Sequence, residues 1–202
     1  MDSWITSIIH DMGYAGVIWL AFVENVFPPI PSELIMPLAG YLAAQGAMTL
    51  PGVIAAGTLG SVLGALLLYA LAWWIGERRL MTFADRHGRW LTLTRQDVER
   101  ASAWFARHGI WAVFACRMIP GLRSLISIPA GLQHMNLAGF FVATTAGSLA
   151  WTALLVYAGY ALGANFGQVG SYIGPISDAV IAGIVVVYLW RVFHGKGKAD
   201  GV

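Results

Sequence analysis

The hydrophobic positions of the chain gather into six long stretches, and most polar residues lie in the segments between them. The stretches comprise residues 4–26, 30–46, 52–76, 109–132, 137–163 and 172–193. An α-helix needs about 20 consecutive apolar residues to cross the hydrocarbon core of a bilayer. Stretches 52–76 and 137–163 contain no charged residue, and 172–193 carries charges only near its ends. Each of these three stretches therefore predicts a membrane-spanning helix.

Two other stretches are interrupted in ways that do not suit a straight crossing. Residues 30–46 are too few for a comfortable span, and Pro37 and Gly40 interrupt them. Residues 109–132 are numerous enough, but their middle holds Arg117, Pro120, Gly121, Arg123 and Pro129. Proline removes a backbone donor and kinks or ends a helix. We therefore expect both stretches to form re-entrant hairpins, whereas residues 4–20 either cross the membrane or lie along its outer surface.

Lysine and arginine are distributed unevenly along the chain. Residues 1–76 contain neither, residues 77–107 contain seven arginines, and the C-terminal tail adds three more basic residues. Cytoplasmic segments of membrane proteins are enriched in Lys and Arg. The arginine-rich segment and the C-terminus are therefore predicted to face the cytoplasm. It follows that stretch 30–46 enters the membrane from the outer surface and stretch 109–132 from the inner one.

The arginine-rich segment, residues 77–108, also shows a helical pattern. Apolar Val98, Ala101, Trp104 and Phe105 recur at helical spacing opposite Arg95, Glu99 and Arg100. A helix with one apolar and one basic face lies in the membrane interface and turns its arginines toward lipid phosphates. The pattern therefore predicts one or two amphipathic helices on the inner leaflet.

Composition supports a single multi-pass membrane domain over residues 1–202. Hydrophobic residues make up 58% of the chain and charged residues 11%, against roughly 25% charged residues in soluble domains. Nucleic-acid-binding modules and disordered tails are thereby excluded. Cys116 is the only cysteine, so an internal disulfide is excluded too. The five histidines are scattered, and we expect no metal site and no cofactor.

A weak internal repeat is visible. Gly60-Ser61 recurs as Gly147-Ser148, and a further glycine follows each pair, at Gly76 and Gly163. Upstream, Ile30-Pro31-Ser32 is similar to Ile119-Pro120-Gly121, and Pro37-Leu-Ala-Gly40 is similar to Pro129-Ala-Gly131. Each copy, 22–76 and 109–163, thus combines a broken hairpin with a glycine-rich spanning helix. One crossing separates the hairpins, so we expect inverted repeats, an architecture typical of transporters.

The two predicted hairpins carry opposite charges. Glu24 and Glu33 belong to the first, and Arg117 and Arg123 to the second. An ionisable group inside the membrane costs several kcal/mol, at least about 2.5, unless it faces a partner or a polar cavity. We therefore expect the four side chains to share a polar chamber. Two alternatives stay open: side chains in interfacial loops or reaching the headgroups, and a buried ion-pair network with a purely structural role.

The segments Glu24-Asn-Val-Phe-Pro-Pro-Ile-Pro-Ser-Glu33 and Phe114-Ala-Cys-Arg117-Met-Ile-Pro120-Gly-Leu-Arg123 carry a family resemblance. With them, residues 14–163 resemble the DedA family, whose SNARE-associated (VTT) domain also occurs in eukaryotic lipid scramblases. The resemblance implies membrane-embedded hairpins and movement of lipids between leaflets. Bacterial members are linked to undecaprenyl phosphate recycling or to phosphatidylethanolamine, some with dependence on proton-motive force. Some members carry an Asp farther along the first hairpin, where this chain has Glu33 after a shorter proline-rich link.

These observations lead to a specific hypothesis. Arg117 and Arg123, with the backbone near Pro120-Gly121, would bind the phosphate of a lipid, because a guanidinium group donates two hydrogen bonds at once. Glu24 and Glu33 would pair with the arginines in the empty site and accept protons when substrate displaces them. The predicted function is a proton-coupled transporter of a phosphate-bearing lipid in the cell (inner) membrane, with undecaprenyl phosphate as the first candidate.

Several rival functions remain open from the sequence. A phosphatidylethanolamine flippase or an uncoupled scramblase would use the same residues, and a proton-coupled transporter of small solutes is a further alternative. A non-transporting scaffold and a homo-oligomer are also left open. An enzyme is the weakest reading, because the chain contains no HExxH motif, nucleophile elbow or Walker loop and no catalytic residues are assigned.

Overall fold

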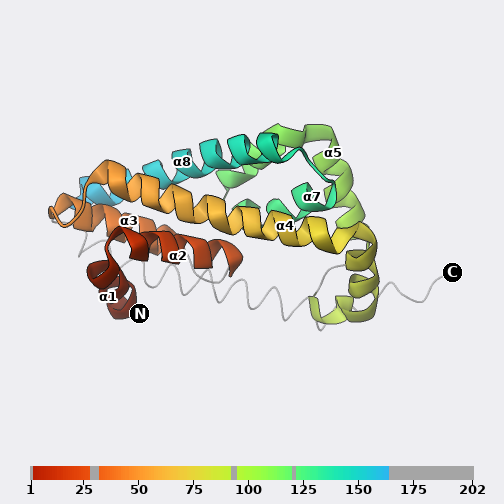
Figure 1. Cartoon of the computed structure of the whole chain (residues 1–202), viewed down its shortest axis with the longest axis horizontal. Helices are drawn as coiled ribbons and strands as arrows, with labels where there is room; N and C mark the ends of the chain where they lie inside the picture. The colour runs from red at the N-terminus through yellow and green to blue at the C-terminus, as the bar shows by residue number, and fades with distance from the viewer. Residues whose placement is uncertain (1, 28–31, 92–94, 120–121, 164–202) are drawn as a thin grey trace.

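The computed structural model describes residues 2–27, 32–91, 95–119 and 122–163, and Figure 1 draws the rest in grey. Eight helices and no strand lie within these ranges. They are α1 (Asp2–Met12), α2 (Tyr14–Val26), α3 (Ser32–Ala44), α4 (Leu50–Leu91), α5 (Arg95–Arg117), α6 (Leu122–Leu125), α7 (Ser127–Leu132) and α8 (Leu137–Leu162). The expectation of an all-helical membrane protein is confirmed for the described part of the chain. The predicted helix 172–193 lies outside it.

Among the described helices, two are long and apolar enough to cross a bilayer: the first part of α4, Leu50–Gly76, and α8. At 1.5 Å per residue the 27 residues of Leu50–Gly76 extend about 40 Å, more than the ~30 Å hydrocarbon core. Both spans end at a glycine with a positive φ angle, 73° at Gly76 and 41° at Gly163. These bounds agree with the predicted stretches 52–76 and 137–163. In Figure 1 the two helices run in opposite directions.

The first hairpin differs from the sequence expectation. Helix α2 ends at Val26 and α3 begins at Ser32, so the helical structure is interrupted between them. Pro37 lies inside a continuous α3. The expectation that Pro37 and Gly40 interrupt this stretch was wrong, since a proline in a packed helix is tolerated when neighbouring helices support it. Gly40 has a different role, because it lies against the backbone of α8 at Val156.

The first arm of this hairpin is α2, which the sequence placed within the N-terminal stretch 4–26. That stretch is divided at Gly13, whose φ is 57°, into α1 and α2. Neither piece is long enough to cross a bilayer alone. The hydroxyl of Tyr14, where α2 begins, accepts a hydrogen bond from the Thr49 backbone N–H at 2.8 Å and contacts the Thr49 hydroxyl at 3.0 Å. This contact joins the base of the hairpin to the start of α4.

The second hairpin begins in α5, which is kinked at Gly109 with a φ of 48°. Its helix ends at Arg117, as expected, and the short helices α6 and α7 return the chain. Pro129 lies within α7 and does not break it, contrary to the expectation. Residues 77–91 and 95–108 are helical, as predicted for the arginine-rich segment.

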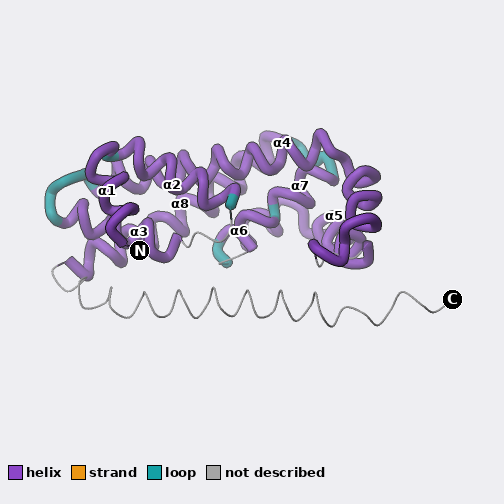
Figure 2. The backbone as a smooth tube through the Cα atoms, turned by 90° about the horizontal axis from the view of Figure 1, so that it is seen from below, coloured by secondary structure: helices purple, strands orange, loops and turns teal. Residues whose placement is uncertain are grey.

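The second arm of each hairpin packs against the long helix of the other copy. Helix α2 packs against α4 and the second part of α5 against α8, so each first arm contacts the long helix of its own copy. The second arms cross over, with α3 packed against α8 and α7 against α4. Figure 1 shows α2 running inward from one end of the molecule and α5 from the other. Helix α6 lies in the middle, in contact with α2 (Figure 2).

Glycines make corresponding close contacts in the two copies. Gly60 of α4 lies against the Ile18 carbonyl of α2, and Gly147 of α8 lies against the Phe114 carbonyl of α5. A methyl group at Gly60 or Gly147 would collide with the facing helix. The absence of a side chain at these two positions therefore permits close packing of the helices.

The second arms show the same correspondence. Gly40 of α3 lies against the Val156 carbonyl, and Gly131 of α7 lies against the Tyr69 carbonyl. Val156 follows Tyr69 by 87 residues, the same interval that separates Gly147 from Gly60. The contacts therefore recur in register along α4 and α8.

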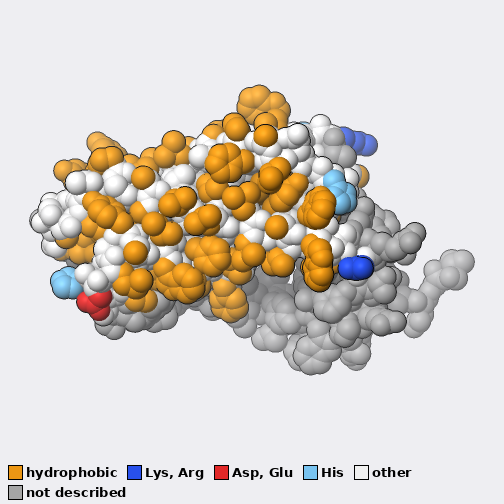
Figure 3. Space-filling model, in the orientation of Figure 1, with side chains coloured by type: hydrophobic (Ala, Val, Ile, Leu, Met, Phe, Trp, Pro, Cys, Tyr) orange, Lys and Arg blue, Asp and Glu red, His pale blue; other side chains and the backbone are white. Residues whose placement is uncertain are grey.

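The surface of this bundle is apolar. Figure 3 shows hydrophobic side chains across the face between α8 and α2, and the described charged side chains of that face lie at its two ends. Trp111 is 74% exposed and Trp74 71%, values that are unfavourable in water. An exposed apolar face of this extent marks contact with lipid or another apolar surface.

Candidate functional site

Three predicted site residues are deeply buried where the hairpins meet. The exposed fraction of Arg117 is 1%, that of Glu24 is 2% and that of Arg123 is 8%. Glu24 lies near the end of α2, Arg117 is the last residue of α5, and Arg123 lies in α6. The structure therefore brings one predicted acid and both predicted arginines into the interior, as the shared-chamber hypothesis requires.

An ion pair joins the two hairpins. The guanidinium group of Arg123 contacts the carboxylate of Glu24, and both side chains are buried. Burying two charges is costly, and their attraction offsets this cost only when the geometry is good and other hydrogen bonds are satisfied. The pair gives each buried charge a counter-charge, and neither carboxylate oxygen of Glu24 has a hydrogen-bond partner among the described residues.

Arg117 is held by neutral groups instead. Its Nη2 donates to the Ser127 hydroxyl at 2.9 Å, and its Nη1 donates to Asn25 Oδ1 at 3.4 Å, a weak hydrogen bond. Asn25 is 1% exposed and Ser127 is fully buried. Among the described side chains, no carboxylate is paired with Arg117. Its positive charge is therefore uncompensated in the described part of the site.

We refer to Glu24, Asn25, Arg117, Arg123 and Ser127 as the inter-hairpin site. Small residues on the long helices make room for it. Gly147 of α8 lies against the Arg117 side chain, and Gly64 of α4 lies against Asn25, where an added methyl would come within 2.6 Å of Asn25 Cβ. The glycine-rich sequence of α4 and α8 thus positions the polar ends of α2 and α5 close to the helix axes.

Several buried donors near the site have no partner among the described residues. They are Arg117 Nε, Asn25 Nδ2 and the Thr144 hydroxyl of α8. A buried donor without a partner costs about 1–3 kcal/mol. These groups can donate to an oxyanion such as a phosphate, and two arginines against one described carboxylate give the site a net positive charge.

Sequence reasoning missed three of these residues. Asn25, Ser127 and Thr144 were not singled out, although each is a polar residue within an apolar stretch, and Asn25 directly follows Glu24. Glu33 lies in the first turn of α3, but its side chain is outside the described part. Pro120 and Gly121 also lie outside the described residues. No cluster of potential metal ligands occurs in the part that the structure describes.

The comparison with protein families gives one match. The sequence model of the VTT domain matches residues 30–161. The chain belongs to the VTT-domain (DedA) family. The matched region includes α3 through most of α8, and therefore Arg117, Arg123 and Ser127. The resemblance identified from the sequence motifs is confirmed.

Relatives within the family cover nearly the whole chain. Undecaprenyl phosphate transporter A of Staphylococcus aureus is 36% identical over all of both chains. Undecaprenyl phosphate transporter A of Bacillus subtilis is 33% identical over 96% of this chain and 92% of its own. An alkaline phosphatase-like protein of Lactococcus lactis subsp. cremoris is 39% identical over 94% of this chain and 89% of its own. No solved structure matches this VTT-domain protein.

Proposed function

We propose that this VTT-domain protein carries a phosphate-bearing lipid between the leaflets of the inner membrane, with undecaprenyl phosphate as the first candidate. The observation that supports it most directly is Arg117, a buried arginine with an unused Nε and no described carboxylate partner. A lipid carrier must shelter an anionic headgroup within hydrocarbon. A guanidinium group suits phosphate because it donates hydrogen bonds in a planar fork.

The fold supports a membrane arrangement with inverted repeats. In this proposal α2 and α3 enter from the outer surface, whereas α5 through α7 enter from the cytoplasmic surface, and neither hairpin crosses completely. The arginine-rich residues 77–108 lie on the inner leaflet, and the C-terminus is cytoplasmic. The exchanged packing of the second arms supports this arrangement, because the same pattern of helix contacts recurs in both copies, as expected for inverted repeats.

The transport cycle uses the acids as transient partners of the arginines. In the empty site Glu24 pairs with Arg123. The lipid phosphate binds Arg117 first, because its Nε is unused, and then competes with Glu24 for Arg123. A carboxylate displaced from its arginine takes up a proton, which couples occupancy to the proton gradient. Glu33 is the second acid of this scheme, and the backbone at Pro120-Gly121 adds donors to the phosphate.

The test is reconstitution in liposomes that contain undecaprenyl phosphate, with and without an imposed proton gradient. Arg117→Lys keeps the positive charge but removes the planar pair of guanidinium donors. The loss of one charge-assisted hydrogen bond, about 1.5–3 kcal/mol, is expected to lower the transport rate roughly 10- to 100-fold. Arg107→Lys, at an exposed position outside the inter-hairpin site, is the matched control. Normal transport by folded Arg117→Lys would refute the assignment.

The same assay separates the rival functions. Flux of phosphatidylethanolamine in place of undecaprenyl phosphate would indicate the alternative flippase. Movement that does not respond to the gradient would indicate an uncoupled scramblase. Solute flux in liposomes without either lipid would indicate a small-solute transporter. Release of inorganic phosphate from the lipid would indicate the hydrolase that the name of the Lactococcus relative suggests.

A further inference from the structure

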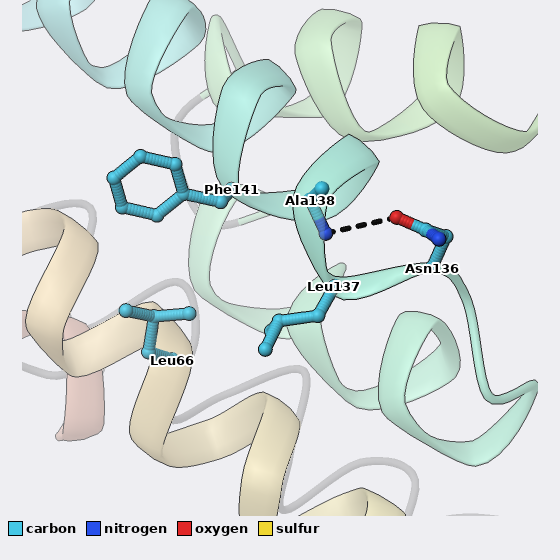
Figure 4. A pocket seen from close by; sticks show the side chains of 5 residues that line it. All are labelled: Leu66, Asn136, Leu137, Ala138 and Phe141. Atoms are coloured by element: carbon cyan, nitrogen blue, oxygen red, sulfur yellow. Dashed lines mark hydrogen bonds between the residues drawn. The ribbon is translucent and has the colours of Figure 1, made fainter.

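A pocket of about 490 Å³ lies between α4 and the start of α8. Its lining residues are Leu66, Asn136, Leu137, Ala138 and Phe141, and we call it the α4–α8 pocket (Figure 4). The exposed fraction of Leu137 is 55% and that of Phe141 is 47%, so the pocket opens on the side of α8 that faces lipid. It is therefore accessible to lipid from the side of the bundle.

The lining chemistry excludes a charged group as occupant. Four of the five lining side chains are apolar. The fifth, Asn136, already accepts hydrogen bonds through Oδ1 from the backbone N–H groups of Ala138 and Gly139, at 2.9 and 3.1 Å. A phosphate there would find no cation among the lining residues, whereas a hydrocarbon chain matches the four apolar side chains.

Two aromatic rings join α4 and α8 next to the pocket. Tyr69 of α4, one turn after Leu66, stacks on Phe140 of α8 with ring centroids 4.7 Å apart. The Tyr69 hydroxyl also donates to the Met135 carbonyl in the turn before α8. These contacts hold α4 and α8 at a constant spacing beside the pocket.

Helix α8 connects this pocket to the inter-hairpin site. Thr144 follows Phe141 by three residues, or about 4.5 Å along the helix, and Gly147, which touches Arg117, follows by about 9 Å. Thr144 is fully buried, and its hydroxyl has no hydrogen-bond partner among the described residues. Along α8 there are thus an apolar pocket, an unused hydroxyl and then a buried arginine, an order that matches the chain and headgroup of one phosphate lipid.

We propose that the α4–α8 pocket binds the hydrocarbon chain of the transported lipid next to its phosphate, while Thr144 and Arg117 bind the phosphate itself. This inference rests on the proposed function. Lipid tails are as apolar as the pocket walls, so transfer from the bilayer supplies little hydrophobic driving force. The pocket therefore contributes orientation: it holds the chain beside the part of α8 that carries Thr144 and Gly147, next to Arg117.

Filling the pocket tests this inference. Ala138→Trp places a large ring in the pocket, and Ala150→Trp places the same ring on an exposed position of α8 outside it. In liposomes with undecaprenyl phosphate we expect Ala138→Trp to lower the transport rate by at least about tenfold through misplacement of the substrate. Ala150→Trp is expected to transport at the wild-type rate. Equal rates for the two tryptophan variants would overturn the proposal.

A labelling experiment tests occupancy directly. With Cys116 replaced by Ala, a single cysteine at Phe141 is reacted with a maleimide in detergent micelles. Undecaprenyl phosphate is expected to slow the reaction at this position, whereas inorganic phosphate at the same concentration is not. Equal protection by phosphatidylcholine would show an ordinary membrane lipid in the pocket and would overturn the proposal.

Failure of this inference differs from failure of the proposed function. If the inference alone is wrong, wild type transports the lipid, Arg117→Lys transports it much more slowly, and Ala138→Trp transports it at the wild-type rate. If the function itself is wrong, wild type shows no transport and no protection by undecaprenyl phosphate in either experiment. Thr144→Val replaces only the unused hydroxyl. It is expected to raise the KM for the lipid without altering the rate at which Phe141→Cys is labelled in the absence of lipid.

Discussion

Glu24, near the end of α2, is paired with Arg123 of α6, and this buried contact joins two hairpins that are 99 residues apart in sequence at these positions. The hydrogen bond between the neighbouring Asn25 and Arg117 joins the same hairpins. Two consecutive residues of α2 thus contact both arginines of the second hairpin. Binding of an anion at either arginine would therefore alter the contact between the two halves of the protein.

The ion pair predicts a large stability effect. Glu24→Gln leaves Arg123 buried without a counter-charge, and breaking a buried pair costs about 3–5 kcal/mol. We expect a lower thermal unfolding temperature in detergent. The exchanged variant, Glu24→Arg with Arg123→Glu, is expected to recover part of this stability but not lipid transport. Full transport by the exchanged variant would indicate a purely structural pair.

The partners of Arg117 predict a change in substrate affinity. Asn25→Asp places a carboxylate beside Arg117 that competes with the lipid phosphate, so the KM for transport should rise while the protein stays folded. Ser127→Ala removes the 2.9 Å hydrogen bond to Arg117 and is expected to lower the free energy of unfolding by about 1–3 kcal/mol. Ser124→Ala, at a buried neighbour, is the control. An unchanged KM in Asn25→Asp would contradict a phosphate site at Arg117.

Two glycines of α8, one tightly packed and one not, allow a comparison of two glycine-to-alanine variants. A methyl group at Gly147 would collide with the Arg117 side chain, whereas one at Gly139 would meet Met135 and Ile110 at ordinary distances of 3.6 and 3.7 Å. Gly147→Ala is expected to destabilise the protein by about 1–3 kcal/mol through overpacking. Gly139→Ala should be neutral or up to about 1 kcal/mol more stable, because alanine favours helix. Thermal unfolding in detergent compares the two, and equal effects would contradict the close packing at Arg117.

The proposed topology predicts which surface each loop reaches. Ala47, before α4, and Ala103, in α5, are both exposed. In a Cys116→Ala background, a membrane-impermeant maleimide added to intact spheroplasts should label Ala47→Cys but not Ala103→Cys. Lysed spheroplasts, which expose both surfaces, should label both positions. Labelling of Ala103→Cys from outside would reverse the proposed orientation.

Local sequence features correctly predicted the helix ends that depend on local chemistry. The long apolar runs gave the spans of α4 and α8, and Gly76 and Gly163 mark their ends because glycine readily adopts a positive φ. The helix break after Arg117 was also expected. Pro37 was misjudged, since whether a proline breaks a helix depends on neighbours that local sequence does not reveal.

The sequence by itself determined that the chain is a helical membrane protein with two long spans and opposite charges in its two interrupted stretches, because run length and charge position act locally. Only the tertiary structure decided the pairings. Phe114 of α5 occupies the position that Ile18 has in α2, so Arg117 corresponds to Ala21, and no repeat in the sequence indicated this. Contacts such as Glu24–Arg123 depend on how helices distant in sequence cross, and close approach at glycines decides which side chains meet.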